Sequence, residues 1–308
     1  MSTSSPEISV IIPTKDRPQM LLRSVESVLN QSILPGEIII VNDGSKISYD
    51  TVLPKLDAVE LNIVYEKLDK SVGPSIARNR AASKASGNIL MFLDDDDIWY
   101  ENKIESQLQK FNQDSEIGLI YTGRKAVDQK GNKLFEVTPN KEIKGNIHRK
   151  LLIDNYIGGT SMAGIAIKKS VFERAGGFDP KLPAREDYDL WIRATKNTLV
   201  CFCDEVLVEY TVHSKKSQQL ANNPQLYLEA KNHMWEKYSD EYQKLSPIER
   251  RKSKANYLTI IADKNSKIGS RTKYKYILLS LLQYPSIAAI SRLIPYHTWI
   301  KIRSYLSN

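Results

Sequence analysis

Short apolar runs alternate with helix-length stretches over the first 125 residues of the chain. The runs are rich in β-branched residues, which is typical of buried strands, and the stretches between them carry apolar residues at helical spacing. Asp16 is expected to cap the first helix, which has Pro18 in its first turn. A second helix is expected to open at Gly73-Pro74. The predicted strands are Ile8–Pro13, Glu37–Val41, Asn62–Tyr65 and Ile89–Leu93.

Strands separated by helices predict an α/β sheet with parallel pairing and right-handed crossovers. The carboxyl ends of parallel strands meet at one edge of the sheet, where open α/β sheets bind ligands. Polar clusters follow three of the predicted strands, and we expect them to line one crevice. These clusters are Pro13–Arg17, Asn42–Ser45 and Asp94–Asp97.

Beyond Gly118 the strand pattern becomes shorter and less regular, and beyond His213 only helical spacing remains. Helices are expected over Lys169–Ala175 and from Glu186. We place a domain boundary near Lys215. It separates a main domain at 1–214, with halves of about 1–125 and 126–214, from a helical region at 215–308. The shorter strands are predicted at Gly118–Thr122, Lys133–Val137, Met162–Ile167 and Leu199–Val212.

The net charge of +8 on the 308 residues is unevenly placed. Residues 215–308 hold 17 basic and 6 acidic side chains, whereas residues 1–214 hold 27 basic and 30 acidic ones. The C-terminal region therefore carries a charge of +11 and the main domain a charge of −3. A basic region of this kind is suited to nucleic acid or to anionic lipid, and charge alone does not choose between them.

Three features favour a cytoplasmic protein. Residues 1–7 lack the basic and then apolar run of a secretory signal. The longest apolar tract, Tyr276–Ile294, is interrupted by Gln283, Pro285 and Arg292, too often for a membrane-spanning helix. The two cysteines, Cys201 and Cys203, form neither a disulfide framework nor a four-ligand zinc motif, so we expect reduced thiols.

Four consecutive aspartates, Asp94–Asp97, follow the fourth predicted strand. Neighbouring carboxylates raise one another's pKa unless a cation or hydrogen-bond donors compensate. Magnesium is commonly held by one or two carboxylates together with substrate phosphates. The structural alternative is a solvated turn or helix cap. Asp16 and Asp43, expected at the same sheet edge, favour the metal site.

Other candidate residues also have ordinary structural alternatives. Arg78, near a helix N-terminus, is suited to binding phosphate, or it extends over the sheet. Glu186 and Asp187 begin a helix and are suited to general-base catalysis, or they complement the helix dipole. His213 follows the last predicted strand, where a lone histidine is commonly structural.

Five motifs, occurring in order over about residues 7–213, resemble those of the family 2 inverting glycosyltransferases of GT-A fold. The resemblance implies a Rossmann-like, mostly parallel central sheet with helices on both faces, followed by a C-terminal helical region. The motifs are Ile8–Arg17, Ile39–Ser45, Gly73–Asn79, Phe92–Asp97 and Arg185–Trp191.

The resemblance also implies roles for individual residues. Asp187 matches the catalytic base, with Glu186 as its neighbour. Manganese or magnesium is expected on Asp96, with Asp94 and His213 as further ligands. Thr211 stands where the family's Tyr-Arg-x-His ending has arginine. The residues implied in nucleotide-sugar binding are Pro13, Thr14, Asp16, Arg17, Asp43, Arg78, Asp94 and Asp95.

The implied reaction is transfer of a hexosyl or N-acetylhexosaminyl group from a nucleoside-diphosphate sugar, a UDP-sugar above all. The acceptor is a hydroxyl of a saccharide or of a lipid-linked compound, in bacterial surface-polysaccharide synthesis. In this reaction Asp187 would take the acceptor's proton and the metal would assist the leaving group.

Two other functions are weighed against glycosyl transfer. A sugar-nucleotide nucleotidyltransferase would need a glycine-rich phosphate loop, and Pro13–Arg17 contains no glycine. A non-enzymatic nucleic-acid-binding protein would use the basic region, but aromatic residues on a basic strand face are not evident. We therefore expect no nucleic-acid partner.

The pattern of apolar and basic residues in the C-terminal region predicts either a membrane-binding surface or a helical cap on the main domain. Pro285 and Pro295 divide its apolar stretches into helices too short to span a bilayer. Basic residues near an anionic surface favour peripheral attachment to the inner face of the plasma membrane. Apolar residues at helical spacing also suit packing on a core. The flanking basic residues are Lys273, Lys275, Arg292, Lys301 and Arg303.

Overall fold

The computed structural model describes residues 7–155, 161–213 and 223–293, which divide into two compact units. The first unit comprises 1–148, 157–180 and 186–214, and the second comprises 149–156, 181–185 and 215–308. Two short segments from within the expected main domain thus belong to the second unit. Lys301 and Arg303 lie outside the described residues.

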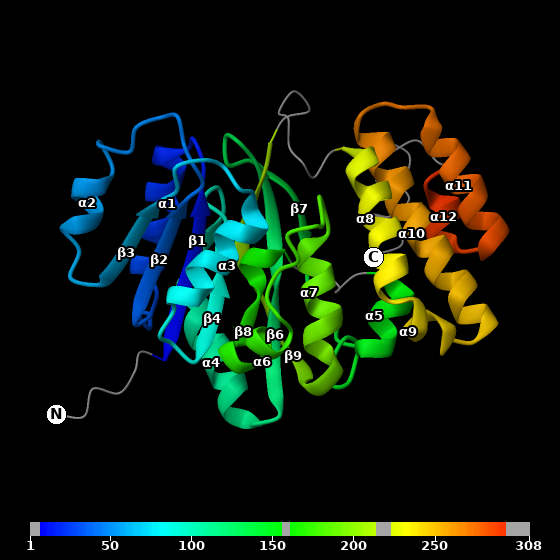
Figure 1. Cartoon of the computed structure of the whole chain (residues 1–308), viewed down its shortest axis with the longest axis horizontal. Coiled ribbons are helices and arrows are strands. Elements are labelled where there is room, and N and C mark those ends of the chain that lie inside the picture. Colours follow the sequence, from blue (N-terminus) through cyan, green and yellow to red (C-terminus); the bar gives the residue numbers. More distant parts are fainter. Residues whose placement is uncertain (1–6, 156–160, 214–222, 294–308) are drawn as a thin grey trace. The chain divides into compact units, whose positions relative to one another are not determined.

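One sheet runs through the first unit in the order β3-β2-β1-β4-β8-β6-β9-β5, with β7 paired to β6 (Figure 1). Its first part is parallel, because helices connect β1 (Ile8–Thr14), β2 (Glu37–Asn42), β3 (Asn62–Lys67) and β4 (Ile89–Phe92). In the second part β6 and β9 pair in parallel and the other pairs are antiparallel. Its strands are β5 (Ile98–Trp99), β6 (Ile117–Asp128), β7 (Lys133–Val137), β8 (Ala166–Lys168) and β9 (Leu199–Val212).

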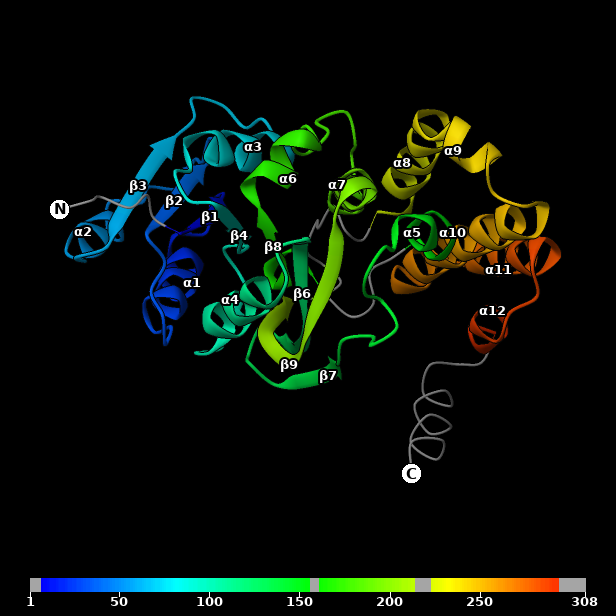
Figure 2. The ribbon, with the colours of Figure 1, turned by 90° about the horizontal axis from the view of Figure 1, so that it is seen from below.

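Helices cover both faces of this sheet (Figure 2). On one face lie α1 (Pro18–Leu29) and α4 (Lys103–Gln113), and on the other lie α3 (Pro74–Lys84), α6 (Lys169–Arg174) and α7 (Glu186–Ala194). A short helix, α2 (Leu53–Asp57), precedes β3, and a 3₁₀ turn at Thr195–Asn197 follows α7. The α/β class predicted from the sequence is confirmed.

Alternate residues of the buried strands supply the two cores. Val10 and Ile12 of β1 belong to one apolar cluster with Leu21 and Val25 of α1. On the opposite face, the Phe92 ring of β4 lies 5.8 Å from that of Phe172 and 5.4 Å from that of Phe178. This two-sided burial holds the carboxyl edge of the parallel strands in place.

The strand expected over Met162–Ile167 is wrong in its first half. Met162–Gly164 form a 3₁₀ turn, and the strand begins only at Ala166. Side chains, rather than a neighbouring strand, satisfy two carbonyls of this turn: Trp99 Nε1 donates to Ala163 O, and Gln107 Nε2 donates to Gly164 O. These partners are distant in sequence, so the local pattern cannot reveal them.

The described part of residues 215–308 is helical. The second unit contains most of α5 (His148–Asp154), together with α8 (Pro224–Lys237), α9 (Ser239–Gln243), α10 (Pro247–Lys267), α11 (Thr272–Gln283) and α12 (Ile287–Ser291). α10 lies between α8 and α11 (Figure 1). It begins with a capping box formed by Ser246 and Glu249. Within the described ranges, no helix has the length and apolar character needed to cross a membrane.

Candidate active site

Polar residues that follow β1, β2 and β4 meet at the carboxyl edge of the sheet. The Asp43 amide donates to Thr14 O at 2.8 Å, and Thr14 Oγ1 donates to Asp95 Oδ2 at 2.7 Å. Pro13, half-buried, precedes Thr14 and lies in register with Val41. The three polar clusters therefore converge, as the strand pattern predicts.

Asp43 fixes the loop that leads into α3. Its carboxylate accepts hydrogen bonds from the Val72 amide at 2.6 Å, the Gly73 amide at 3.1 Å and Ser71 Oγ at 2.8 Å. Gly44 has a φ of +63°, and a Cβ there would lie 2.4 Å from the Lys70 carbonyl carbon. Only glycine allows the two loops to approach so closely.

Asp16 fixes a second loop at the edge and does not cap α1 as expected. Its Oδ1 accepts from the Lys46 amide at 2.7 Å and the Ile47 amide at 3.0 Å. The hydrogen bond from Ile47 is the main cause that lowers the pKa of Asp16. Arg17 occupies the N-cap position of α1 without a side-chain hydrogen bond there. The backbone at Asp16 is left-handed, with φ 56°.

Two arginines compensate the charges of the four aspartates. Arg17 Nη1 lies 3.0 Å from Asp95 Oδ1 and 2.6 Å from Asp96 Oδ2. Arg78 Nη2 lies 2.5 Å from Asp94 Oδ1. The repulsion that the sequence predicts is therefore offset by guanidinium groups from α3 and from the start of α1.

Three of the aspartates differ in pKa because they differ in burial and partners. Burial raises the pKa of Asp95, which is 5% exposed, to about 6. Burial also raises the pKa of Asp97 well above its usual value, and Asp97 Oδ2 has no hydrogen-bond partner among the described residues. For Asp96 burial acts in the same direction, but the hydrogen bond with His213 and the charge of Arg17 outweigh it and lower the pKa.

Asp96 and His213 form the best-placed pair for a divalent metal. His213 Nε2 lies 2.6 Å from Asp96 Oδ2, and His213 Nδ1 lies 3.1 Å from Gln129 Nε2. A carboxylate beside an imidazole fits manganese or magnesium when substrate oxygens complete the coordination. No group of three His, Cys, Asp or Glu side chains suited to a metal occurs in the described part of the chain. Asp94, the third expected ligand, pairs with Arg78, and its role as a metal ligand stays a prediction.

Glu186 and Asp187 stand at the start of α7, beside this edge. Arg78 Nη1 lies 3.2 Å from Glu186 Oε1, so one guanidinium joins Glu186 to Asp94. Burial is the main cause that raises the pKa of Glu186, and the charge of Asp187 adds to it. Asp187 is half-buried, and its Oδ1 accepts from the Tyr188 amide at 2.6 Å. Buried Leu190 and Trp191 anchor the helix that carries both carboxylates.

Three residues of the site are missed by the sequence reasoning. The Tyr49 hydroxyl lies 2.7 Å from Thr14 Oγ1, Ser71 binds Asp43, and Gln129 contacts His213. They lie in loops outside the recognised motifs, and only the tertiary fold brings them to the edge. Thr211 is engaged through its amide, which donates to Asp97 Oδ1 at 3.0 Å. The side chain is engaged as well, because Thr211 Oγ1 donates to Asp96 O at 2.5 Å.

The chain is similar in sequence to known glycosyltransferases. The family model described as Glycosyl transferase family 2 matches residues 9–176. An uncharacterized glycosyltransferase of Rickettsia typhi is 29% identical over 281 residues, 90% of this chain and 85% of that protein. TuaG of Bacillus subtilis, whose name assigns it provisionally to teichuronic acid biosynthesis, is 28% identical over 68% of this chain and 81% of its own length. Some relatives are longer: the match to a Rickettsia felis glycosyltransferase spans 44% of that protein.

Solved structures share the fold at low sequence identity. The mannosyltransferase PcManGT of Pyrobaculum calidifontis, in complex with GDP-Man and Mn²⁺, matches with a TM-score of 0.59 and 16% identity. That match covers 99% of this chain and 86% of the other. TarS 1–349 of S. aureus, in complex with UDP-GlcNAc, matches with a TM-score of 0.56 and 14% identity, over 91% of this chain and 89% of that one. The GT-A fold expected from the sequence is thus confirmed.

Proposed function

The chain belongs to glycosyl transferase family 2 and is a glycosyltransferase, and we propose that it transfers a sugar from a nucleoside-diphosphate sugar to an acceptor hydroxyl with inversion. The observation that carries this proposal is the pair of contacts made by Arg78. It joins Asp94, at the end of β4, to Glu186, which precedes Asp187. A donor-binding edge and a general-base candidate are thereby held together by one side chain.

The loops at the sheet edge suit the nucleotide of the donor. Thr14, Asp43 and Asp95 form a buried hydrogen-bonded group there, and we assign it to the base and ribose. Pro13 and Asp16 shape the surrounding loops, and Arg17 and Arg78 supply positive charge for the phosphates. UDP-GlcNAc bound to TarS and GDP-Man bound to PcManGT support a nucleotide-sugar donor. Among these we propose a UDP-sugar that carries a hexosyl or N-acetylhexosaminyl group.

Asp187 is the residue that we assign as general base. It is half-buried at the N-terminus of a core-anchored helix, where its carboxylate is held by the Tyr188 amide. A carboxylate in this setting accepts the proton of the acceptor hydroxyl as that oxygen attacks the anomeric carbon. Glu186, paired with Arg78, positions the start of the helix.

Asp96 and His213 are the residues that we propose to hold a manganese or magnesium ion, together with the donor phosphates. Their side chains are adjacent, and the relative PcManGT carries Mn²⁺ in its complex. When bound, the ion would neutralise charge on the departing diphosphate. Arg17, on Asp96, provides positive charge at the same carboxylate.

The function is tested by incubating the purified chain with a panel of nucleotide sugars and metals. The expected products of donor hydrolysis are the free sugar and the nucleoside diphosphate, and with a saccharide acceptor NMR should show an inverted anomeric configuration. Release of nucleoside monophosphate and sugar phosphate would instead indicate cleavage of the diphosphate. No donor hydrolysis with any nucleotide sugar would contradict the proposal.

The acceptor that we propose is a saccharide or lipid-linked compound of bacterial surface-polysaccharide synthesis, reached at the inner face of the membrane. Similarity to TuaG supports the pathway. An exposed apolar row on α11 and α12 supports the membrane surface: Leu278 is 60%, Leu282 63% and Ile287 82% exposed. Lys273 and Lys275 lie on α11 beside it, so charge and apolar area both favour an anionic bilayer.

Liposome sedimentation tests this attachment. The full chain should bind anionic vesicles at low salt and dissociate at high salt, because salt screens the attraction. Leu278→Gln with Leu282→Gln should weaken binding, whereas Ile33→Gln, at an exposed apolar residue in the first unit, should leave it unchanged. Binding to neutral vesicles alone, or none at low salt, would contradict peripheral attachment through this face.

A further inference from the structure

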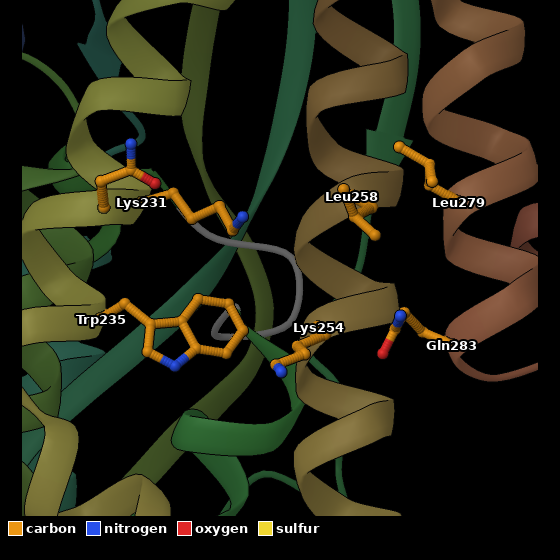
Figure 3. Close-up of a pocket in the computed structure, with 7 residues that line it drawn as sticks. Lys231, Trp235, Lys254, Leu258, Leu279 and Gln283 are labelled. Carbon is orange, nitrogen blue, oxygen red and sulfur yellow. The ribbon is translucent and has the colours of Figure 1, made fainter.

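Helices α8, α10 and α11 of the second unit line an open surface hollow of about 380 Å³ (Figure 3). Lys231 and Trp235 project into it from α8, Lys254 from α10, and Gln283 from α11. Asn232 and two leucines complete its lining. The hollow thus combines two cations, one large aromatic ring and two amides, and none of these residues takes part in the proposed catalytic site.

The two lysines share one tryptophan. Lys231 Nζ lies 5.2 Å and Lys254 Nζ 5.5 Å from the centre of the Trp235 ring. Neither lysine forms an ion pair with a carboxylate among the described residues. Burial is the main cause that lowers the pKa of Lys231, and the charge of Lys254 lowers it further. An anion between these two ammonium groups would relieve their repulsion.

Trp235 is held firmly enough to act as a binding surface. Its ring stacks on Tyr242 with centroids 5.2 Å apart and an interplanar angle of 28°. The aromatic face suits the C–H face of a sugar ring, and the amides of Asn232 and Gln283 can donate to and accept from hydroxyl groups. A free inorganic anion would bind to the lysines alone and would make no use of the Trp235 ring or of the two amide groups.

We propose that this hollow binds an anionic saccharide, a sugar ring that bears a phosphate or a carboxylate. The lysines would hold the charged group, Trp235 the ring, and the amides the hydroxyls. The role of the site rests on the proposed function, because it would hold an acidic acceptor chain for glycosyl transfer. Binding itself requires no reaction and is measured without one.

The test is calorimetric titration of the full chain at low salt. The probes are glucose 6-phosphate, glucuronate, glucose and inorganic phosphate. We expect the two anionic sugars to bind at least about tenfold more tightly than glucose or phosphate, and the tighter of the two identifies the charged group.

Binding of the anionic sugars should be about tenfold weaker in each of three variants: Lys231→Gln, Lys254→Gln and Trp235→Leu. Lys244→Gln, an equal charge change at an exposed residue outside the hollow, should not weaken it.

The outcomes separate this site from the catalytic one. Lys231→Arg should retain binding, and circular dichroism of each variant identifies any loss caused by unfolding. Inorganic phosphate binding as tightly as the anionic sugars would overturn the saccharide assignment. Binding that persists in both lysine variants would overturn the site. A failure of donor hydrolysis with intact, lysine-dependent binding would contradict the proposed function and leave the binding site standing.

Discussion

Arg78 contacts a residue that lies 108 positions away along the chain, Glu186. It is buried, and it pairs with Asp94 and with Glu186. Burial alone would lower its pKa, but these carboxylates raise it above the ordinary value, so the side chain stays charged. From the sequence, Arg78 is equally suited to phosphate or to the sheet surface. Its two acidic partners follow only from the fold.

Asp187→Asn should lower the turnover number by about 100-fold or more, because it removes the proposed general base. Donor affinity should remain unchanged, since the proposed proton transfer takes place on the acceptor. Steady-state kinetics with donor titration measures both quantities. If Asp187 serves only the helix dipole, the variant would keep its turnover and lose thermal stability instead.

Chelation should abolish transfer, and manganese or magnesium should restore it. Asp96→Ala should prevent the restoration, because Asp96 is the central ligand that we propose. Binding of Mn²⁺ in the presence of UDP, followed by electron paramagnetic resonance, gives a readout that does not depend on activity. Asp57→Ala, at an exposed aspartate of α2, is the control. Full activity in excess chelator would exclude the metal assignment.

At the residue scale, the sequence reveals which side chains converge but not how they are partnered. Three clusters at strand ends predict the edge, since strand topology alone brings them together. Coulomb repulsion among Asp94–Asp97 predicts a compensating cation, and the structure supplies Arg17 and Arg78 for that purpose. Repulsion therefore does not by itself demonstrate a metal. Asp16 and Asp43 shape loops through backbone amides, which carry no signal in the sequence.

Elements with a strong local signal are predicted closely. For β1, β2 and α1, the apolar residues that indicate the element and the residues that end it all lie within one short stretch of sequence. β5 (Ile98–Trp99) has no such signal, because it is two residues long and pairs with Val208 and Glu209 of β9, far away along the chain. Short strands of this kind depend on partners that a window of sequence does not contain.

Lys103, the first residue of α4, gives a stability prediction for that helix. Its ammonium group is fully buried, 2.6 Å from Gln107 Oε1 and 3.9 Å from the Trp99 ring centre. Burial lowers the pKa of Lys103 from 10.5 to about 7. Between these values the unfolded chain binds a proton that the folded chain lacks, so this group makes stability rise with pH from about 7 upward.

Lys103→Met should therefore raise the Tm at pH 7, and it should remove this part of the increase between pH 7 and pH 9. Thermal unfolding of both proteins across that range measures the effect, and their difference cancels the titration of other groups. Lys110→Met, on the same helix, should leave the pH dependence unchanged. A Tm that falls at pH 7 would show that the packing of Lys103 outweighs its desolvation.

For the whole molecule, the sequence and the structure divide the chain differently. The change from strand to helical spacing predicts a boundary near Lys215, and that boundary remains a prediction for the functional domains. The second unit also takes in residues 149–156 and 181–185. Ser253 Oγ donates to Leu152 O at 2.6 Å, and Asn155 Nδ2 donates to Ser253 O at 3.0 Å, which binds α5 to α10. The pattern of residues along the chain does not show that these two segments pack with the second unit.

A chain that ends at residue 214 should consequently be unstable. It would expose Leu151 and Leu152, which are buried, and leave Asn155 without the carbonyl of Ser253. Unpaired polar groups and exposed leucines each cost on the order of 1–3 kcal/mol, which is a large part of the stability of a typical domain. Size-exclusion chromatography and thermal unfolding of this truncation should show aggregation or a strongly lowered Tm.

In the full chain, Asn155→Ala should lower the Tm for the same reason. Asn256→Ala removes a hydrogen bond to Ile153 O from a less buried side chain, so it should lower the Tm by less. A truncated chain that remains monomeric, unfolds at the Tm of the full chain and hydrolyses donor would instead place the functional boundary at Lys215.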